Sequence, residues 1–226
     1  MGTDLTPVLL DRATIVAPRL LGGVLAHTKG ELSVGIRITE VEAYEGAVDP
    51  GSHAYRGLTP RTTPMFGAPP QVYIYLSYGI HSCLNIVCAP EGEGQGCLIR
   101  GGEVVWGSEL MGERRAKARS SRDWARGPGN VGSALAVSTQ MSGSYLNLKA
   151  LPNNFSPTIE ESELIKLLAP AHGLTLYLPS VATPEYCQSG RIGVSGEGGD
   201  AKRFPWRFYL PNEPSVSRHP PSVARQ

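Results

Sequence analysis

Residues 34–44, with the sequence VGIRITEVEAY, constrain the fold more than any other part of the chain. Apolar and β-branched residues recur along this segment, which predicts a β-strand. Strand side chains alternate between two faces, so one face would run from the apolar Val34 to Glu40, Glu42 and Tyr44. Carboxylates are rarely buried without a partner or a function. The pattern therefore predicts a strand that ends at the floor of a pocket, with a candidate base beside a ring that can stack on a flat ligand.

Length and composition predict one globular domain. A chain of 226 residues can bury a substantial core, and 41% hydrophobic with 18% charged residues is typical of a folded protein. We expect residues 1–218 to form this domain and residues 219–226, at the end of a segment rich in Pro and Ser, to form a flexible tail. The formal net charge of +1 excludes a polycation, so a nucleic-acid surface would require local clustering of basic residues.

One basic cluster lies at residues 113–126, ERRAKARSSRDWAR, with six basic and two acidic residues. A run of this kind is most often a solvated helix face. The alternative is a surface that contacts phosphates, and the segment taken alone favours the solvated face.

The four cysteines indicate neither a disulfide scaffold nor a metal site. They form no C-x-x-C pair, and their number is low for a secreted scaffold. His81 with Cys83 and Cys88 matches no zinc-ligand spacing well, so buried small hydrophobic side chains are the better interpretation. No apolar run approaches ~20 residues, and the first residues lack the features of a signal peptide. We expect a cytoplasmic protein with reduced thiols and with no metal or cofactor.

Hydrophobic periodicity and turn residues outline the secondary structure. A helix is expected within residues 5–21, and further helices are expected at about 106–119 and at 131–137. Strands are expected at residues 23–28, 32–44, 71–78, 80–87, 97–105, 174–178, 190–194 and 206–210. A turn is expected at Lys29-Gly30 and a tight hairpin or bulge at Tyr78-Gly79. Residues 45–71 and 142–158 are expected to be irregular. Strands and helices without βαβ alternation predict an α+β fold.

The segment GEGGDA at residues 196–201 matches the dinucleotide-binding pattern G-x-G-x-x-A but does not predict such a site. Pro205 interrupts any following helix, and only 25 residues remain after Ala201 for the rest of that fold. We therefore interpret the segment as a loop. The chain also lacks the sequence markers of P-loop NTPases, zincins and serine hydrolases of the G-x-S-x-G type.

Five motifs in a fixed order carry a stronger signal than any one of them. They are TEVEAY at residues 39–44, SH at 52–53, TPR at 59–61 with MF at 65–66, VYIYLSYGIHSCLN at 72–85, and CLIR at 97–100. With WRFY at 206–209 and SVS at 215–217, their order and spacing resemble the alkyladenine DNA glycosylase family, the mammalian-type 3-methyladenine DNA glycosylases. The resemblance covers nearly the whole chain.

The resemblance implies a fold, a reaction and a partner. The fold would be a single compact domain with a curved, mostly antiparallel β-sheet, flanking helices and a protruding β-hairpin. Members of the family are monofunctional: they use water to hydrolyse the N-glycosidic bond of alkylated or deaminated purines in duplex DNA, after rotating the nucleotide out of the stack. This implies a monomeric base excision repair enzyme that binds damaged double-stranded DNA, in the nucleoid of a prokaryote or the nucleus of a eukaryote.

Glu42 and Arg100 match the catalytic residues of the family. The resemblance makes Glu42 the base that deprotonates the attacking water, and its charge would stabilise a transition state that resembles an oxocarbenium ion. Arg100 would contact the same water and favour the ionised form of Glu42. The backbone carbonyl near Val194 is a third candidate contact. From the residues alone, Glu42 could instead be a structural carboxylate paired with Arg37 or Arg100, and Glu40 is expected to have a supporting role.

Tyr44, His53 and Tyr75 match the aromatic residues that bind the base in the family. A purine would lie between Tyr44 and the pair formed by His53 and Tyr75, because stacking accepts several damaged purines and favours cationic ones. Asn85 matches the side chain that opposes the exocyclic amine of normal guanine, and Leu98 would line the same pocket.

Tyr78 matches the residue that enters the minor groove and fills the space left by the rotated nucleotide, with Ile80 and His81 beside it. Tyr73, which lies two residues before Tyr75, is interpreted as a core residue. In the light of the resemblance, candidate phosphate contacts are Arg61, Arg114, Arg115 and Lys117.

Two other classes of function stay open at this point. A nucleic-acid-binding protein could keep the fold without catalysis, although it would need neither Glu42 nor Arg100. A nucleoside hydrolase could combine a carboxylate base with an aromatic purine pocket, although Tyr78 and the basic segment favour a polymer substrate. The sequence determines neither the preferred lesion nor a proton donor for neutral purines.

Overall fold

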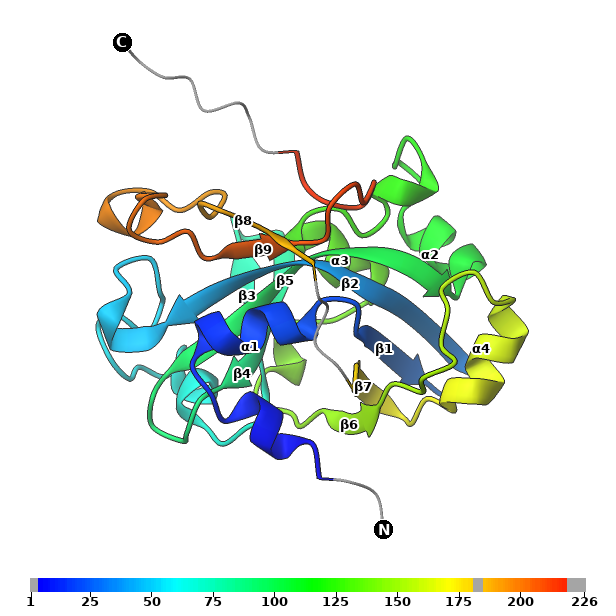
Figure 1. Cartoon of the computed structure of the whole chain (residues 1–226), viewed down its shortest axis with the longest axis horizontal. Helices are drawn as coiled ribbons and strands as arrows, with labels where there is room; N and C mark the ends of the chain where they lie inside the picture. The colour runs from blue at the N-terminus through cyan, green and yellow to red at the C-terminus, as the bar shows by residue number, and fades with distance from the viewer. Residues whose placement is uncertain (1–3, 181–184, 219–226) are drawn as a thin grey trace.

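The long strand β2 (Leu32–Glu45) is the central element of the fold. In the computed structural model, which describes residues 4–180 and 185–218, it runs through the middle of a curled β-sheet (Figure 1). β2 pairs with β1, β5 and β9, so segments from three parts of the chain meet along it. The predicted tail, residues 219–226, lies outside the described residues.

The sheet has the strand order β3-β4-β5-β2-β1-β7-β6, and β9 joins β2 to β8. Pairings between these strands are antiparallel except that of β6 with β7. The predicted α+β fold with a mostly antiparallel sheet is therefore confirmed. The remaining strands are β1 (Val24–Lys29), β3 (Val72–Ser77), β4 (His81–Cys88), β5 (Gln95–Trp106), β6 (Asn147–Ala150), β7 (Gly173–Leu178), β8 (Cys187–Ser189) and β9 (Arg207–Tyr209).

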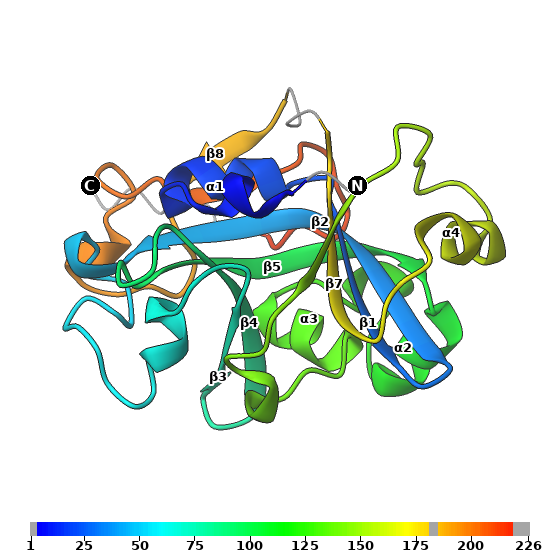
Figure 2. The same ribbon diagram turned by 90° about the horizontal axis from the view of Figure 1, so that it is seen from below.

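Helices cover both faces of the sheet (Figure 2). α1 (Ala13–Leu20) packs on β2, and its buried side chains follow helical spacing at Ala13, Val16, Ala17 and Leu20. α3 (Pro128–Ala134) packs on β4 and β5 from the other side. This contact is so close that a Cβ on Gly132 would come within 1.9 Å of the carbonyl oxygen of Ser82, so only glycine fits there. The other helices are α2 (Ser108–Arg114) and α4 (Glu161–Leu168).

The helix expected within residues 5–21 is confirmed as α1, which follows a 3₁₀ turn at Thr6–Leu9. Two other sequence predictions of local structure are wrong. Residues 190–194 form a loop, and the strand lies just before it at Cys187–Ser189. Residues 142–158 contain β6, an edge strand whose mixed exposure gives no alternating pattern. In each case a tertiary contact decides the backbone where periodicity is weak.

Helix α4 begins within a run of acidic residues, Glu160, Glu161 and Glu163, and was not predicted. The Glu160 carboxylate accepts a hydrogen bond from the Ser162 amide and so caps the first turn, where negative charge is favourable. Leu164 and Leu168 face the core four residues apart. The helix predicted at residues 106–119 is shorter in the structure. It is α2, which ends at Arg114, and the rest of the basic segment consists of turns and a 3₁₀ helix.

The pairing of β2 with β5 is irregular at Glu40. The register shifts between Ile38 and Glu40 and again between Glu40 and Val41, so the assumption of an uninterrupted alternation along β2 is wrong. Buried apolar side chains accordingly pass from Ile36 and Ile38 to the odd-numbered Val41 and Ala43. From Val41 onward the register is regular, so Glu42 and Tyr44 keep a common face.

Candidate active site

A pocket of about 270 Å³ opens where β2, β3 and β4 meet the loops at residues 46–71 and 190–199. Because these segments are distant in the sequence, only the folded chain forms the pocket. Its wall combines small backbone segments at Gly51 and Gly193 with aromatic and polar side chains. The predicted site residues that line it are Tyr44, His53, Tyr75, Asn85 and Val194.

Glu42 lies behind this lining and is fully buried. Its Oε2 accepts a hydrogen bond from the Tyr44 hydroxyl at 2.9 Å and one from Arg100 Nη1 at 3.3 Å. Its Oε1 accepts one from the backbone amide of Ile192 at 2.7 Å. The fold thus brings the predicted pair Glu42 and Arg100 together. Arg37, the other candidate partner, pairs instead with Glu103 and Glu213.

Glu40, Glu42, Arg100 and Arg207 form what we term the buried charge cluster, in which every residue is at most 5% exposed. Glu40 Oε1 accepts hydrogen bonds from Arg100 Nε at 3.0 Å and from Arg207 Nε at 2.6 Å. Its Oε2 accepts one from the backbone amide of Ser217 at 2.6 Å. Glu40 therefore holds Arg100 in place, which matches the supporting role expected of it.

The two carboxylates of the cluster have opposite pKa shifts. Burial raises the pKa of Glu42, and Arg100, the Ile192 amide and the Tyr44 hydroxyl only partly oppose it. For Glu40, burial also acts to raise the pKa, but Arg100 and Arg207 with the Ser217 amide outweigh it and lower the pKa below its usual value. Glu42 is therefore the carboxylate that takes up a proton more readily, as a general base requires.

Arg191 lies against Tyr44, a contact that no sequence pattern indicated. The guanidinium carbon is 4.5 Å from the centroid of the Tyr44 ring, and the same side chain forms a two-point ion pair with Asp49 at 2.6 and 2.7 Å. Burial first, and then the nearby charge of Glu42, raise the pKa of Tyr44, so its hydroxyl stays protonated and can donate to Glu42. The segment around Arg191 was predicted as a strand, and no local pattern pairs it with Asp49.

His53, Tyr73 and Tyr75 form a second aromatic group at the pocket. The rings of His53 and Tyr75 meet edge to face with centroids 4.5 Å apart, and Tyr75 stacks on Tyr73 at 5.7 Å. The Tyr73 hydroxyl lies 3.1 Å from His53 Nδ1, so Tyr73, interpreted from sequence as core, also lines the pocket. Burial and the charge of Arg61 lower the pKa of His53, which favours the neutral imidazole.

Three other predicted pocket residues occupy distinct positions. The Asn85 side-chain amide donates to the carbonyl of Tyr73 at 3.0 Å, which fixes its orientation in the pocket wall. Leu98 is buried in β5 between Glu42 and Asn85 and is not among the residues that line the pocket. Val194 also lines the pocket, and its carbonyl oxygen lies beside Gly199. The backbone of the same loop contacts Glu42 through the Ile192 amide.

The β3–β4 hairpin presents apolar side chains to solvent. Tyr78 is 91% exposed and Ile80 is 74% exposed at its tip. Tyr78 and Gly79 both have positive φ, of 50° and 73°, and the Ile80 amide donates to the Ser77 carbonyl, as in a type I′ turn. His81 is exposed at the start of β4, where its ring packs on Gly129 at the start of α3. Tyr78, Ile80 and His81 thus lie together, as predicted for a groove-binding element.

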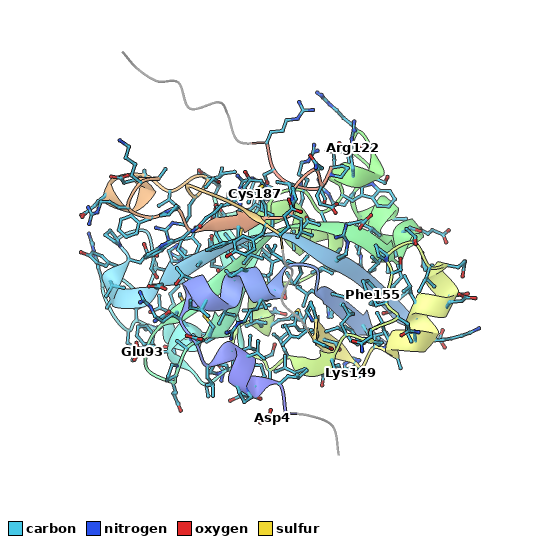
Figure 3. All side chains as sticks on the ribbon, viewed as in Figure 1. Asp4, Glu93, Arg122, Lys149, Phe155 and Cys187 are labelled. Carbon is cyan, nitrogen blue, oxygen red and sulfur yellow. The ribbon has the colours of Figure 1, made fainter. Side chains whose placement is uncertain are left out.

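The predicted phosphate-contact residues differ in how free their charges are. Arg114 Nη1 donates to the carbonyl of Ala134 at 2.7 Å and so ties α2 to the end of α3. Arg115 is partly buried and Lys117 is exposed. Arg61 lies at the pocket, with its guanidinium carbon 5.7 Å from the Tyr75 ring centroid. Arg119 and Arg122 of the same segment are also exposed, and Figure 3 shows Arg122 at the surface, so Lys117, Arg119 and Arg122 are the best placed of this segment to meet a ligand.

Within residues 4–180 and 185–218, no group of three or more His, Cys, Asp or Glu side chains is arranged to hold a metal ion. The four cysteines are free thiols. Over the same residues, no helix combines the length and the apolar character needed to cross a bilayer.

Comparison with known families confirms the family indicated by the motifs. A family model described as methylpurine-DNA glycosylase matches residues 8–214 of the chain. The match spans the pocket, the buried charge cluster and the hairpin.

Bacterial relatives are similar over almost the same length. One from Leifsonia xyli subsp. xyli is 47% identical over 215 residues, which is 92% of this chain and 89% of the relative. A relative from Streptomyces avermitilis is 41% identical and covers 95% of this chain and 91% of its own length. One from Cutibacterium acnes is 44% identical and covers 89% of this chain and 93% of its own length. All three are named, provisionally, as 3-methyladenine DNA glycosylases.

Proposed function

Since this chain belongs to the methylpurine-DNA glycosylase family, we propose that it excises alkylated and deaminated purines from duplex DNA and so initiates base excision repair. The family defines the enzyme as a DNA glycosylase, a hydrolase of N-glycosidic bonds. The substrates we propose are 3-methyladenine, 7-methylguanine, hypoxanthine and ethenoadenine. The observation that carries the proposal is the buried Glu42 carboxylate held behind an aromatic pocket by Arg100, Tyr44 and the Ile192 amide.

The proposed reaction is a displacement by water. Glu42 accepts a proton from water while the water oxygen forms a bond to the anomeric carbon. The C–N bond breaks, and its electron pair leaves with the purine. Negative charge on Glu42 stabilises the positive charge that develops on the sugar, and Arg100 holds the carboxylate at 3.3 Å. None of the described residues that line the pocket is a lysine, which supports attack by water and a product with an intact abasic site.

The pocket walls support binding of a rotated purine. Tyr44, His53 and Tyr75 all line the pocket, which supports stacking of a base between Tyr44 and the pair formed by His53 and Tyr75. Stacking on aromatic faces accepts several damaged purines, and a cationic purine such as 7-methylguanine also gains from the negative face of each ring. An alkylated, cationic purine leaves without acid catalysis, whereas hypoxanthine requires protonation.

The hairpin and the basic segment support a duplex substrate. Tyr78 is almost fully exposed and can enter the minor groove, filling the gap that a rotated nucleotide leaves. Lys117 and Arg122 are exposed and can contact phosphates without reading sequence. One pocket and one wedge are sufficient for a lesion, so we propose a monomer that acts in the bacterial cytoplasm at the nucleoid.

Base release from defined duplexes tests the proposal. The protein is incubated in excess over duplexes with one hypoxanthine or one 1,N6-ethenoadenine, and with methylated genomic DNA, and free purine is quantified. We expect release from at least one of the three, with abasic strands that break only after alkali. Strand cleavage without alkali would contradict the monofunctional reaction, and no release from any substrate would exclude the proposed activity and favour the non-catalytic binding protein.

A further inference from the structure

Arg191 joins the pocket wall to the elements behind it. Its side chain is fully buried in an ion pair with Asp49, and the same two Nη atoms donate to two backbone carbonyls. Nη1 donates to the carbonyl of Ala43 at 3.0 Å and Nη2 to that of Gly198 at 2.8 Å. The guanidinium therefore ties strand β2, beside Tyr44, to the loop that carries Asp49 and to the turn at residue 198.

The same guanidinium backs the ring of Tyr44. It lies 4.5 Å from the Tyr44 centroid, and Trp206 and Phe204 close around it at 5.3 and 5.7 Å. Tyr44 lines the pocket whereas Arg191 does not, so the cation packs on the Tyr44 ring from outside the pocket lining. A planar cation in this position fixes the plane of the ring more firmly than a flexible apolar side chain would.

Arg191 is also the residue before Ile192, whose amide donates to Glu42 Oε1 at 2.7 Å. Anchoring residue 191 at four points therefore places the next peptide group against the carboxylate. The three residues that follow, Gly193, Val194 and Ser195, form one side of the pocket. Two parts of the site, its stacking wall and its carboxylate, thus depend on one buried side chain.

We propose that Arg191 is a positioning residue of the glycosylase site, which sets both the plane of the Tyr44 ring and the hydrogen bond that holds Glu42. The catalytic part of this inference rests on the proposed function. The placement of the Tyr44 ring and of the Glu42 hydrogen bond by Arg191 does not depend on it. Arginine is required because its planar fork pairs with Asp49 at two points while it stacks on a ring, and lysine can do neither.

Other charges also act on Glu42, so a test must isolate the contribution of Arg191. A lysine at position 191 keeps the positive charge and removes the fork and the stacking plane. Any change in the pKa of Glu42 then reports the loss of the arginine's geometry and not the loss of its positive charge. The ionisable groups that face Glu42 or interact with its charge are Arg100, Glu40, Tyr44, Tyr75 and Arg191.

The first measurement is the titration of the Glu42 carboxyl in the free protein, followed by ¹³C NMR and assigned by its loss in Glu42→Gln. We expect Arg191→Lys to raise the midpoint of this titration, because a displaced Ile192 amide no longer stabilises the ionised form. Asp49→Asn keeps Arg191 and weakens its pairing with residue 49. We expect it to shift the midpoint in the same direction by a smaller amount. An unchanged midpoint in a folded Arg191→Lys protein would overturn the inference, whether or not the enzyme releases base.

The second measurement is single-turnover release of hypoxanthine with enzyme in excess. In Arg191→Lys we expect the saturating rate constant to fall about 100-fold, since misplacement of about 1 Å has effects of this size. The enzyme concentration for half-saturation should rise as well, because Tyr44 is less well placed to stack. If Arg191→Lys unfolds in a single transition and still has the wild-type rate constant at saturation, the inference is overturned.

Arg37→Lys is the matched control. Arg37 is largely buried and pairs with two carboxylates, Glu103 and Glu213, but contacts no residue of the pocket. We expect this variant to lose stability without moving the Glu42 titration or the saturating rate constant. If it moved both as Arg191→Lys does, the effect would be one of general destabilisation and the assignment of Arg191 would fail. Absence of base release by the wild-type enzyme would reject the proposed function and leave the NMR result to decide the inference.

Discussion

The buried charge cluster and the tip of the β3–β4 hairpin reverse the usual distribution of side chains. The cluster places two carboxylates and two guanidinium groups in the interior, whereas the hairpin places Tyr78 and Ile80 in solvent. Each charge of the cluster has partners within hydrogen-bond distance, which stabilises it in the interior. Tyr78, in contrast, lies in solvent at a residue with positive φ. The interior thus holds its charged groups in a fixed geometry, whereas the hairpin exposes apolar side chains for the contact with DNA that we propose.

The two carboxylates of the cluster should separate catalysis from stability. We expect Glu42→Gln to lower single-turnover base release about a thousandfold, since an amide cannot accept the proton from water. Its unfolding temperature should change little, because an amide of the same shape fills the site without the burial cost of a charge. Activity near that of the wild type would remove Glu42 from the role of base and break the comparison.

Glu40→Gln should have the opposite profile. Removing this charge leaves Arg207 buried without a carboxylate partner, and we expect a loss of about 3 kcal/mol in the free energy of unfolding. Chemical denaturation of Glu40→Gln and Glu42→Gln side by side measures the difference. Equal losses in the two variants would show that the cluster acts as one structural unit without a division of roles.

The pH dependence follows from the opposite pKa shifts. Burial raises the pKa of Glu42 above its ordinary 4.5, so between the two values the folded state binds more protons and its stability falls as pH rises. Base release should rise through the same window, about tenfold per pH unit below the midpoint, because the ionised form acts. Glu40 has a lowered pKa, so its stabilisation is present above 4.5 and is lost as pH falls through the lowered value.

A single-turnover pH profile on a cationic lesion, with an unfolding series over the same pH range, checks these signs. Glu42→Gln should remove the falling stability slope while the acid loss due to Glu40 remains. A rate that increased toward low pH would exclude an ionised Glu42 as the acting species.

Tyr78→Asn should improve the hairpin and impair its proposed use. Asparagine adopts positive φ more readily than tyrosine at this turn position, so stability should rise by about 1 kcal/mol. Affinity for a lesion duplex should fall about tenfold, since the ring no longer fills the gap in the stack. Unchanged affinity, measured by fluorescence anisotropy with an ethenoadenine duplex, would argue against a wedge.

The smallest expected effect concerns the basic segment. Lys117→Ala removes one exposed charge and should weaken binding to undamaged and damaged duplexes alike by a few fold, with the slope of log affinity against log salt reduced by about 0.9. Arg114→Ala is the contrasting variant, because its guanidinium already binds the Ala134 carbonyl and its loss should lower stability. A slope unchanged by Lys117→Ala would exclude that residue as a phosphate contact.

Strong local patterns predicted the fold well, and weak ones did not. The strands at β1 through β5 follow from apolar and β-branched runs with Gly turns, and the structure confirms them. β6 and β8 are short, partly exposed strands held by their neighbours, so no periodicity shows them. α4 was not predicted, although an acidic N-cap followed by Leu164 and Leu168 is a recognised helix signal.

The site was predictable to the extent that it follows from spacing along one strand. Glu42 and Tyr44 are two residues apart, so a β-strand places them together whatever surrounds it, and their hydrogen bond shows that they share a face. The irregular pairing at Glu40 precedes them and leaves this relation intact. The partners that fix the site come from 142 to 167 residues away: Arg191 to Asp49, Ile192 to Glu42 and Arg207 to Glu40.

The strand, its two carboxylates and the family of the chain follow from the order of the amino acids, because alternation and motif order are local properties. The difference between the carboxylates follows from the fold. Both are fully buried, but Glu40 has two arginines and an amide as partners and a lowered pKa, whereas Glu42 has one arginine and a raised pKa. A pKa depends on the charges and dipoles that surround a group in space, and these come from β5, β9 and the loop at residues 190–199, which the sequence places far away.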